Sequence, residues 1–251
     1  MTVSGQDDLS ITLVSDSQLE EIVLTGYGSQ RREELTSAIS TIKSEDFNGG
    51  NINDPQQLLQ GKVAGLNIAR VGSDPNQPFN IRLRGLSTFG ANAEPLVIID
   101  GVIGGTLDSV DPADIESINV LKDASAGAIF GSRGSSGVII VTTKTGKGVA
   151  KSGLEYRGYV SSEEISNLIP MASYDEFLSY GGLNLGSKTD WVDLVSRTAI
   201  SQVHNIAFTG SSANGLSYRA SLNYRDIEGV LNTSGFEQIN GRINVTIRPF
   251  I

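Results

Sequence analysis

Two runs near the end of the sequence alternate between apolar and polar residues without an exception, and they restrict the possible folds more than any other segment. The apolar positions are Leu216, Tyr218, Ala220, Leu222 and Tyr224 in the first run, and Ile239, Gly241, Ile243, Val245 and Ile247 in the second. Because successive side chains of a β-strand point to opposite faces, this period of two predicts strands with one apolar and one polar face. Each run has about 10 residues, the length of a tilted strand that crosses a membrane.

Residues 154–160 and 203–209 alternate more weakly and are two further candidate strands. Between them we expect two short helices, near residues 173–180 and 190–196. A soluble antiparallel sandwich shows the same period of two, with its polar face outward. Periodicity alone leaves the sandwich and the transmembrane barrel open, since the barrel signal in each strand is weak.

The composition removes several functional classes. The chain has 251 residues, of which 39% are hydrophobic, enough for a sizeable core in one or two domains. Its formal net charge of -9 gives no broad basic surface for phosphates, so we expect no nucleic-acid partner. The absence of cysteine excludes disulfides, zinc–thiolate sites and thiol catalysis.

The apolar runs are too short for a transmembrane helix. Runs such as residues 96–99 and 137–141 fall far below the roughly 20 residues that such a helix needs, so a role in a membrane requires β-strands. Residues 1–10 contain neither a positively charged region nor an apolar region. We therefore expect no export signal in this chain.

Residues 37–145 alternate between strand and helix signals, which predicts a compact α+β domain. Asp54 is a candidate N-cap, Pro55 suits the first helical position, and Gly61 can take the left-handed conformation that ends the helix. Residues 96–99 are apolar throughout, as expected of a strand covered on both faces, and Asp100 begins a turn. The other expected elements are strands at residues 66–71, 79–84, 115–121 and 138–143, and a helix from Asp123 to Phe130.

The N-terminal part is extended rather than helical. Residues 18–32 combine β-forming residues with glycines that disfavour a helix, a composition typical of a tether. Upstream, a short alternating stretch within residues 3–14 is typical of one terminal strand of a small domain.

Six motifs follow one another along the chain. They are E-I-V-L-T-G-Y-G at residues 21–28, L-Q-G-K-V-A-G-L at 59–66, I-R-L-R-G at 81–85, D-I-E-S-I-N-V-L-K-D-A-S-A at 114–126, F-G-S-R-G at 130–134 and G-V-I-I-V-T-T-K at 137–144. In this order they resemble the opening of the SusC/RagA-type TonB-dependent transporters of Bacteroidota, and the later three are the most specific. The resemblance continues to residues 240–242, so it covers nearly the whole chain.

The resemblance implies an α+β plug domain followed by an incomplete antiparallel transmembrane β-barrel. Members of this family close a barrel of about 22 strands, whereas this chain supplies about four. The implied divisions are a remnant of an upstream small β domain at residues 1–17, the TonB-box segment and tether at 18–34, the plug at 35–148, and the first strands and loops of the barrel at 149–251.

The resemblance also assigns the TonB box, the segment that pairs as an added strand with the energy-transducing protein TonB. An extended segment can give main-chain hydrogen bonds to an exposed sheet edge, which suits that role. Taken without the family, the same residues would more simply form an ordinary edge strand. The box comprises Glu21, Ile22, Val23, Leu24 and Thr25.

Two arginines are candidates for holding the plug in the barrel. Arg82 and Arg84 fall on one face of a short expected strand, opposite Ile81 and Leu83. In similar transporters, plug arginines pair with acidic residues on the inner wall of the barrel. The alternative is that both arginines are simply solvated.

No motif predicts catalysis. Neither Gly61-Lys62 nor Gly146-Lys147 has the upstream glycine and the following Ser or Thr of a nucleotide-binding P-loop. The single histidine, His204, has no acidic or cysteine partner at ligand spacing, and we expect it to be an ordinary lumen-facing or interface residue. We therefore expect no enzymatic activity, no cofactor and no metal.

The resemblance implies a transporter for nutrient uptake, set in the lipid of the outer membrane. Its plug would block the barrel until a substrate is captured with a SusD-like surface lipoprotein, after which TonB pulls the plug using the proton-motive force. The cargo would be an oligosaccharide or a peptide too large for porins. The alternative is a truncated, non-transporting interaction module that binds TonB but forms no pore, which the missing export signal and incomplete barrel favour for this chain.

Overall fold

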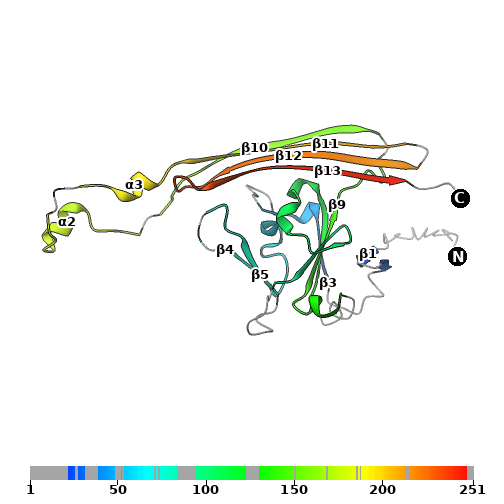
Figure 1. The fold of residues 1–251 in the computed structure, drawn as a ribbon, viewed down its shortest axis with the longest axis horizontal. Helices are drawn as coiled ribbons and strands as arrows, with labels where there is room; N and C mark the ends of the chain where they lie inside the picture. Colours follow the sequence, from blue (N-terminus) through cyan, green and yellow to red (C-terminus); the bar gives the residue numbers. More distant parts are fainter. Residues whose placement is uncertain are drawn as a thin grey trace, which may run out of the picture.

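A computed structural model of the chain shows two layers, a long four-stranded sheet and an α+β domain that lies against one of its faces (Figure 1). The described residues are 22–25, 28–31, 39–48, 52, 54–70, 72, 74–83, 94–122, 130–149, 151–167, 169–184, 186, 188–212 and 215–247. The segment at residues 1–17 and most of the helix expected from Asp123 lie outside them. The described helices include none long and apolar enough to cross a membrane.

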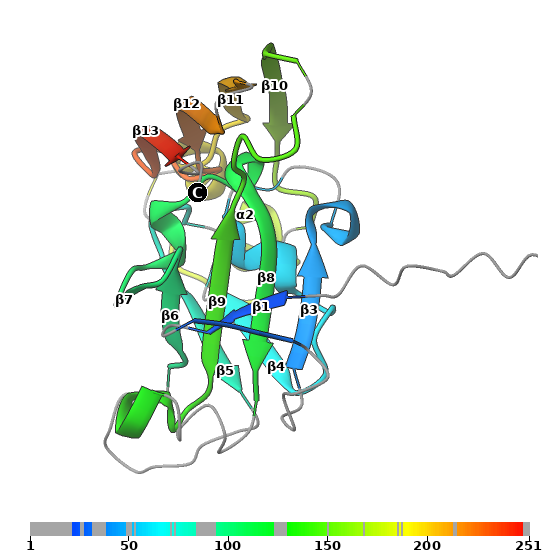
Figure 2. The same cartoon turned by 90° about the vertical axis from the view of Figure 1, so that its right-hand side faces the viewer.

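The α+β domain is built on a five-stranded mixed sheet with the strand order β3-β8-β9-β6-β7. The pair β6 and β9 is parallel and the other pairs are antiparallel. Figure 2 shows β3, β8, β9 and β6 side by side. The strands are β3 (Ile39–Lys43), β6 (Leu96–Ile99), β7 (Val102–Ile103), β8 (Ile115–Leu121) and β9 (Val138–Thr143).

Apolar side chains cover both faces of this sheet, because adjacent residues of its central strands are buried alike. On β9, Val138 and Ile140 pack in a small cluster with Ile98, while Ile139 and Val141 belong to a larger one. The larger cluster includes a separate hairpin, β4 (Leu66–Arg70) with β5 (Phe79–Leu83), and the 3-10 helix η3 (Pro55–Leu59). The run at residues 96–99 is therefore a strand covered on both sides, as its composition predicted.

The expected cap and turn residues lie where the sequence placed them. The Asp54 side chain accepts a hydrogen bond of 2.7 Å from the backbone N–H of Gln56, and Pro55 is the first residue of η3. Gly61 follows with φ +75°. The predicted helix is a five-residue 3-10 helix, so its place is confirmed but it is shorter and tighter than an α-helix.

Four antiparallel strands in sequence order form the long sheet. They match the four runs with alternating sequence, although the strands extend beyond each run. Their bounds are β10 (Gly153–Glu163), β11 (Ala199–Ser211), β12 (Leu216–Glu228) and β13 (Gly235–Ile247). Among its described residues, the α+β domain has the 3-10 helices η2 (Ser44–Asp46), η3 (Pro55–Leu59), η4 (Leu107–Ser109), η5 (Pro112–Asp114) and η6 (Gly131–Gly134).

The long sheet has its apolar face outward and its polar face buried. Ile243 is 75% exposed and Leu222 is 54% exposed, whereas Arg219 and Asn223 are 6% and 2% exposed. A soluble sandwich has the opposite arrangement, so the structure favours strands of a barrel whose outer face meets lipid. His204 lies among the outward residues, stacked between Tyr156 and Tyr224, so of the two expected positions the lumen-facing one is wrong and the interface one stays a prediction.

The connection from β10 to β11 is long and projects beyond the end of the long sheet (Figure 1). It carries α2 (Tyr174–Ser179), which begins with a capping box between Ser173 and Glu176. Next comes α3 (Trp191–Val195), where the Asp190 side chain accepts hydrogen bonds from the backbone N–H groups of residues 192 and 193. Both expected helices are confirmed.

Candidate functional site

The most developed site in the chain is the contact between the α+β domain and the buried face of the long sheet. At its centre is the carboxylate of Asp114, the last residue of η5. One oxygen of Asp114 accepts a hydrogen bond of 3.1 Å from the Arg219 guanidinium. The other oxygen accepts 2.6 Å from the Ser221 hydroxyl and 2.9 Å from the Asn223 amide. Three donors of β12 therefore bind one carboxylate.

These groups are almost completely removed from solvent. The side chains of Asp114 and Arg219 are 2% and 7% exposed. Arg219 also donates a hydrogen bond of 2.9 Å to the Thr209 hydroxyl, and Asn223 accepts one from Asn205 on β11. A buried charge needs a counter-charge and hydrogen bonds to offset its desolvation, so Asp114 and Arg219 depend strongly on each other.

A second buried ion pair lies beside the first. Arg225 Nε donates a hydrogen bond of 2.8 Å to Asp111, and both side chains are under 5% exposed. The second carboxylate oxygen of Asp111 accepts 2.8 Å from the backbone N–H of Ala113 and so caps η5. The same aspartate therefore fixes the η5 turn and binds the long sheet.

A third ion pair is closer to solvent. Arg242 Nη1 on β13 lies 3.1 Å from an Asp100 carboxylate oxygen, with side chains 26% and 33% exposed. Asp100 also accepts hydrogen bonds from the backbone N–H and the hydroxyl of Thr143. Asn244 donates 3.0 Å to that hydroxyl and 3.1 Å to the Lys144 carbonyl. We name the three pairs, Asp114–Arg219, Asp111–Arg225 and Asp100–Arg242, the polar contact.

Strand direction explains why the three aspartates gather together. Asp100 follows β6 and Asp114 precedes β8, and these strands run in opposite directions because each pairs with β9, one parallel and one antiparallel. The end of β6 and the start of β8 therefore lie at the same edge of the mixed sheet. On the other side, Arg219 and Arg225 are six residues apart on β12, and a period of two places them on one face.

Asp54 is a titratable group at the margin of the polar contact. Burial raises the pKa of Asp54 to about 7, and the nearby Asp108 carboxylate adds to the increase. The backbone N–H of Gln56 and the charge of Arg225 oppose the increase. Asp54, Asp108 and Arg225 line a cavity of about 220 Å³ between the two layers.

Gly146 marks a very close approach between the layers. A Cβ atom at this position would lie 2.5 Å from the Tyr218 carbonyl oxygen and 2.8 Å from that of Gly210. We expect Gly146→Ala to lower the free energy of unfolding by about 1–3 kcal/mol, since backbone atoms must move apart. Urea titration in detergent micelles measures this, with Gly153→Ala as the control because nothing lies within 4 Å of its added Cβ. An equal loss in both variants would contradict the close-approach explanation.

The structure places the predicted partner-binding residues only in part. Ile22–Thr25 form β1, which pairs antiparallel with β2 (Gly28–Arg31), and Glu21 lies outside the described residues. Arg82 is exposed on β5, while Arg84 also lies outside the described residues. The TonB box and the pairing of Arg82 and Arg84 with a barrel wall therefore stay predictions.

Sequence reasoning missed the residues that make the polar contact. In this contact the acids are on the α+β domain and the arginines on the long sheet, the opposite of the polarity expected for Arg82 and Arg84. The sequence indicates only a turn at Asp100 and a family motif at Asp114. The available signal was the presence of Arg219, Arg225 and Arg242 on the polar face of two expected strands.

Comparison with known proteins gives the class. Residues 31–138 match the family model of the TonB-dependent receptor plug domain. The α+β domain is therefore the plug of a TonB-dependent receptor, and the long sheet whose polar face it contacts is the start of the barrel. Within this class the chain belongs to the SusC/RagA type, as the following relatives show.

The relatives are similar to this chain along most of its length. The TonB-dependent receptor SusC of Bacteroides thetaiotaomicron is 36% identical over 94% of this chain and 25% of its own length. A TonB-dependent receptor of Formosa agariphila is 36% identical over 99% of this chain and 27% of its own length. The solved RagAB peptide importer in its open-open state superposes with a TM-score of 0.79 at 27% identity, covering 90% of this chain and 30% of that chain. The chain thus spans about a quarter of the length of these curated relatives.

Proposed function

We propose that this chain gates an outer-membrane importer, with the plug blocking the barrel and TonB drawing the plug aside using the proton-motive force. The observation that carries this proposal is the polar contact. Two domains that never separate would bury apolar surface against each other. Here, ion pairs and hydrogen bonds hold the plug against the long sheet, which is the barrel wall. Such groups can exchange their partners for water when the plug moves, which suits a gate that opens and closes.

The outer membrane is the proposed location because of the outward face of the long sheet. Ile239, Ile243 and Ile247 of β13 and Leu154 and Val160 of β10 are among its exposed apolar residues. Such a face is costly in water and favourable in lipid.

The proposed cargo is an oligosaccharide or a peptide captured with a SusD-like lipoprotein. The solved relative is described as a peptide importer, which supports the peptide class. The connection between β10 and β11 supports a protein partner at that end of the sheet, since it exposes large apolar side chains beyond the strands. Examples are Ile169, Tyr180, Leu183 and Trp191.

The proposed TonB box is already extended. β1 pairs with β2 through four residues and lies outside the five-stranded sheet of the plug. The backbone of β1 is therefore already extended as an added strand must be. Main-chain hydrogen bonds between β1 and the edge of a partner's sheet would give the affinity.

A proline in the box tests the proposal. We expect Val23→Pro to weaken binding of the chain to the periplasmic domain of TonB at least about tenfold, because proline removes a backbone donor from the added strand. Surface plasmon resonance measures the affinity, and Ser10→Pro upstream of the box is the matched control. Unchanged affinity in Val23→Pro, or equal losses in both variants, would reject the assignment of the box.

A further inference from the structure

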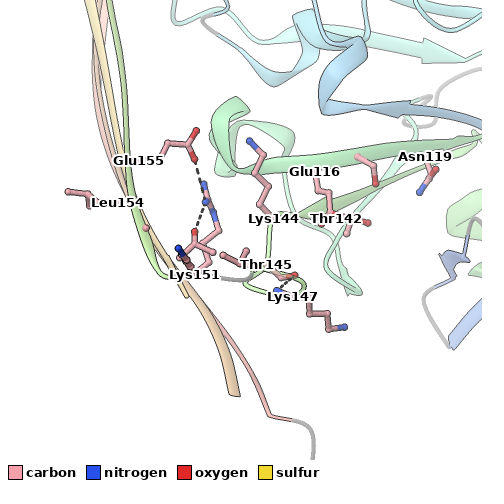
Figure 3. Close-up of a pocket in the computed structure, with 14 residues that line it drawn as sticks. Glu116, Asn119, Thr142, Lys144, Thr145, Lys147, Lys151, Leu154 and Glu155 are labelled. Carbon is pink, nitrogen blue, oxygen red and sulfur yellow. Dashed lines mark hydrogen bonds and ion pairs between the residues drawn. The ribbon is translucent and has the colours of Figure 1, made fainter. Parts of the chain in front are cut away.

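A cavity of about 790 Å³ lies between the plug and the first barrel strand. On the plug side it is bordered by the first half of β8, the end of β9 and the segment that follows β9, and on the other side mainly by the start of β10 (Figure 3). In Figure 3 Glu155 lies toward the cavity, and Leu154 is on the opposite side of the strand. Hydroxyl and amide groups contribute to the lining through Ser117, Asn119, Thr142, Thr145 and Thr209.

The charges around this cavity are positive on balance, although the chain as a whole has a net charge of -9. Four cationic residues and two acidic ones line the cavity. Glu155 is already engaged by Arg157 at 2.5 Å and by Arg219 at 3.8 Å. Within the described part of the chain, no carboxylate lies within ion-pair distance of Lys144, whose ammonium instead donates 2.7 Å to the Ala113 carbonyl.

Two cations of the lining are removed from solvent, Arg219 almost completely and Lys144 in part. Arg219 is 6% exposed, and its Nε has no hydrogen-bond partner. The pKa of Lys144 is lowered by burial and then by the positive charges of Arg157 and Arg219, while the carboxylates of Glu155 and Asp114 oppose this decrease. A half-buried ammonium with no carboxylate at ion-pair distance indicates that an anion can be its partner in the cavity.

We propose that this cavity binds an oxyanion, a carboxylate or a phosphate, between Lys144 of the plug and Arg219 of the wall. The oxyanion accepts hydrogen bonds from the Lys144 ammonium and from the threonine hydroxyls, with the positive charge of Arg219 beside it, and charge-assisted bonds of this kind are the strong ones. It bridges plug and wall beside the Asp114–Arg219 pair. The site concerns binding to the closed plug and is independent of the proposed import, so either can fail without the other.

Calorimetric titration of the full chain in detergent micelles at low ionic strength tests this site. We expect saturable binding of N-acetyl-trialanine with a free carboxylate, and at least about tenfold weaker binding of its carboxamide. Lys144→Gln should weaken carboxylate binding about tenfold. Lys62→Gln changes an exposed plug lysine that is not part of the cavity lining, and should leave the binding unchanged. Lys151→Gln at the cavity should also weaken it, without disturbing the bond to Ala113.

Inorganic phosphate distinguishes the two sources of an oxyanion. Tighter binding of phosphate than of the peptide identifies a free small anion as the occupant, and tighter binding of the peptide identifies an anionic group of a larger solute. Equal binding of the peptide acid and its carboxamide overturns the proposal. Undiminished carboxylate binding in both Lys144→Gln and Lys151→Gln also overturns it, because the anion then lies elsewhere.

Discussion

Replacing Asp114 by asparagine is expected to destabilise the polar contact by about 3–5 kcal/mol, because Arg219 then stays buried without its counter-charge. The amide keeps one acceptor oxygen, so the loss reflects charge more than shape. Urea titration of the chain in detergent micelles measures the change in the free energy of unfolding. Hydrogen exchange of the β12 amides shows whether the loss is at the contact, since local opening exposes amides that are otherwise protected.

The matched control is Asp100→Asn at the third ion pair. This pair joins the same two layers, but its side chains are 33% and 26% exposed. Water screens exposed charges, so we expect a loss of at most about 1 kcal/mol. Equal losses at Asp100 and Asp114 would contradict the view that burial determines the strength of the contact.

A double variant separates the charge from the packing. Removing Arg219 as well, in Asp114→Asn with Arg219→Met, takes away the uncompensated cation and should recover part of the loss. Full additivity of the two single losses would show that the side chains do not act as a pair. In the proposed importer, Asp114→Asn should also let the plug separate from the wall under less force from TonB.

The fold could be predicted from the sequence where the signal is local. The alternation at residues 216–225 gives each side chain its face without reference to any other segment. Asp54 and Pro55 likewise mark the start of η3 by short-range hydrogen bonding and a fixed φ. The type of that helix does not follow from the local signal, because core packing of Leu58 and Leu59 can hold so short a helix in the tighter 3-10 form.

The site could not be predicted in the same way, because its partners are far apart in sequence. Asp114 and Arg219 are separated by 105 residues, and no periodicity connects them. They meet because the edge of the plug sheet that holds the end of β6 and the start of β8 lies against the polar face of the long sheet, which depends on strand order and on how the two layers pack. Alternation showed that Arg219 and Arg225 face the polar side, but it gave no information about whether the opposing charge came from the plug or from the wall.

Asp54 is expected to make the plug less stable as the pH rises from about 4 to 8. Burial and Asp108 raise the pKa of Asp54 from 3.8 to about 7, so the folded chain binds this proton more tightly than the unfolded chain does. Stability therefore falls with increasing pH while the unfolded state is ionised and the folded state is still protonated. The loss should total about 2–4 kcal/mol and level off once Asp54 is ionised in the folded state.

Asp54→Asn tests this assignment without removing the helix cap, since asparagine can still accept the hydrogen bond from Gln56. We expect this variant to be more stable than the parent chain at pH 8 by about 2–4 kcal/mol, and similar to it near pH 4. Urea titrations at intervals between pH 4 and 8 measure the slope. Asp190→Asn is the control, because Asp190 caps α3 in the same way at an exposed position.

The neighbours of Asp54 determine how this pH dependence reaches the polar contact. The ionisable groups that line its cavity are Asp108, Arg70 and Arg225, and Arg225 is also bound by Asp111. An ionised Asp54 adds a further carboxylate around Arg225, so Asp111→Asn should reduce the cost of ionising Asp54 and flatten the pH slope. If Asp54→Asn and the parent chain show the same slope, the titrating group lies elsewhere. If Asp111→Asn leaves the slope unchanged, Asp54 titrates without affecting the ion pair that holds the plug.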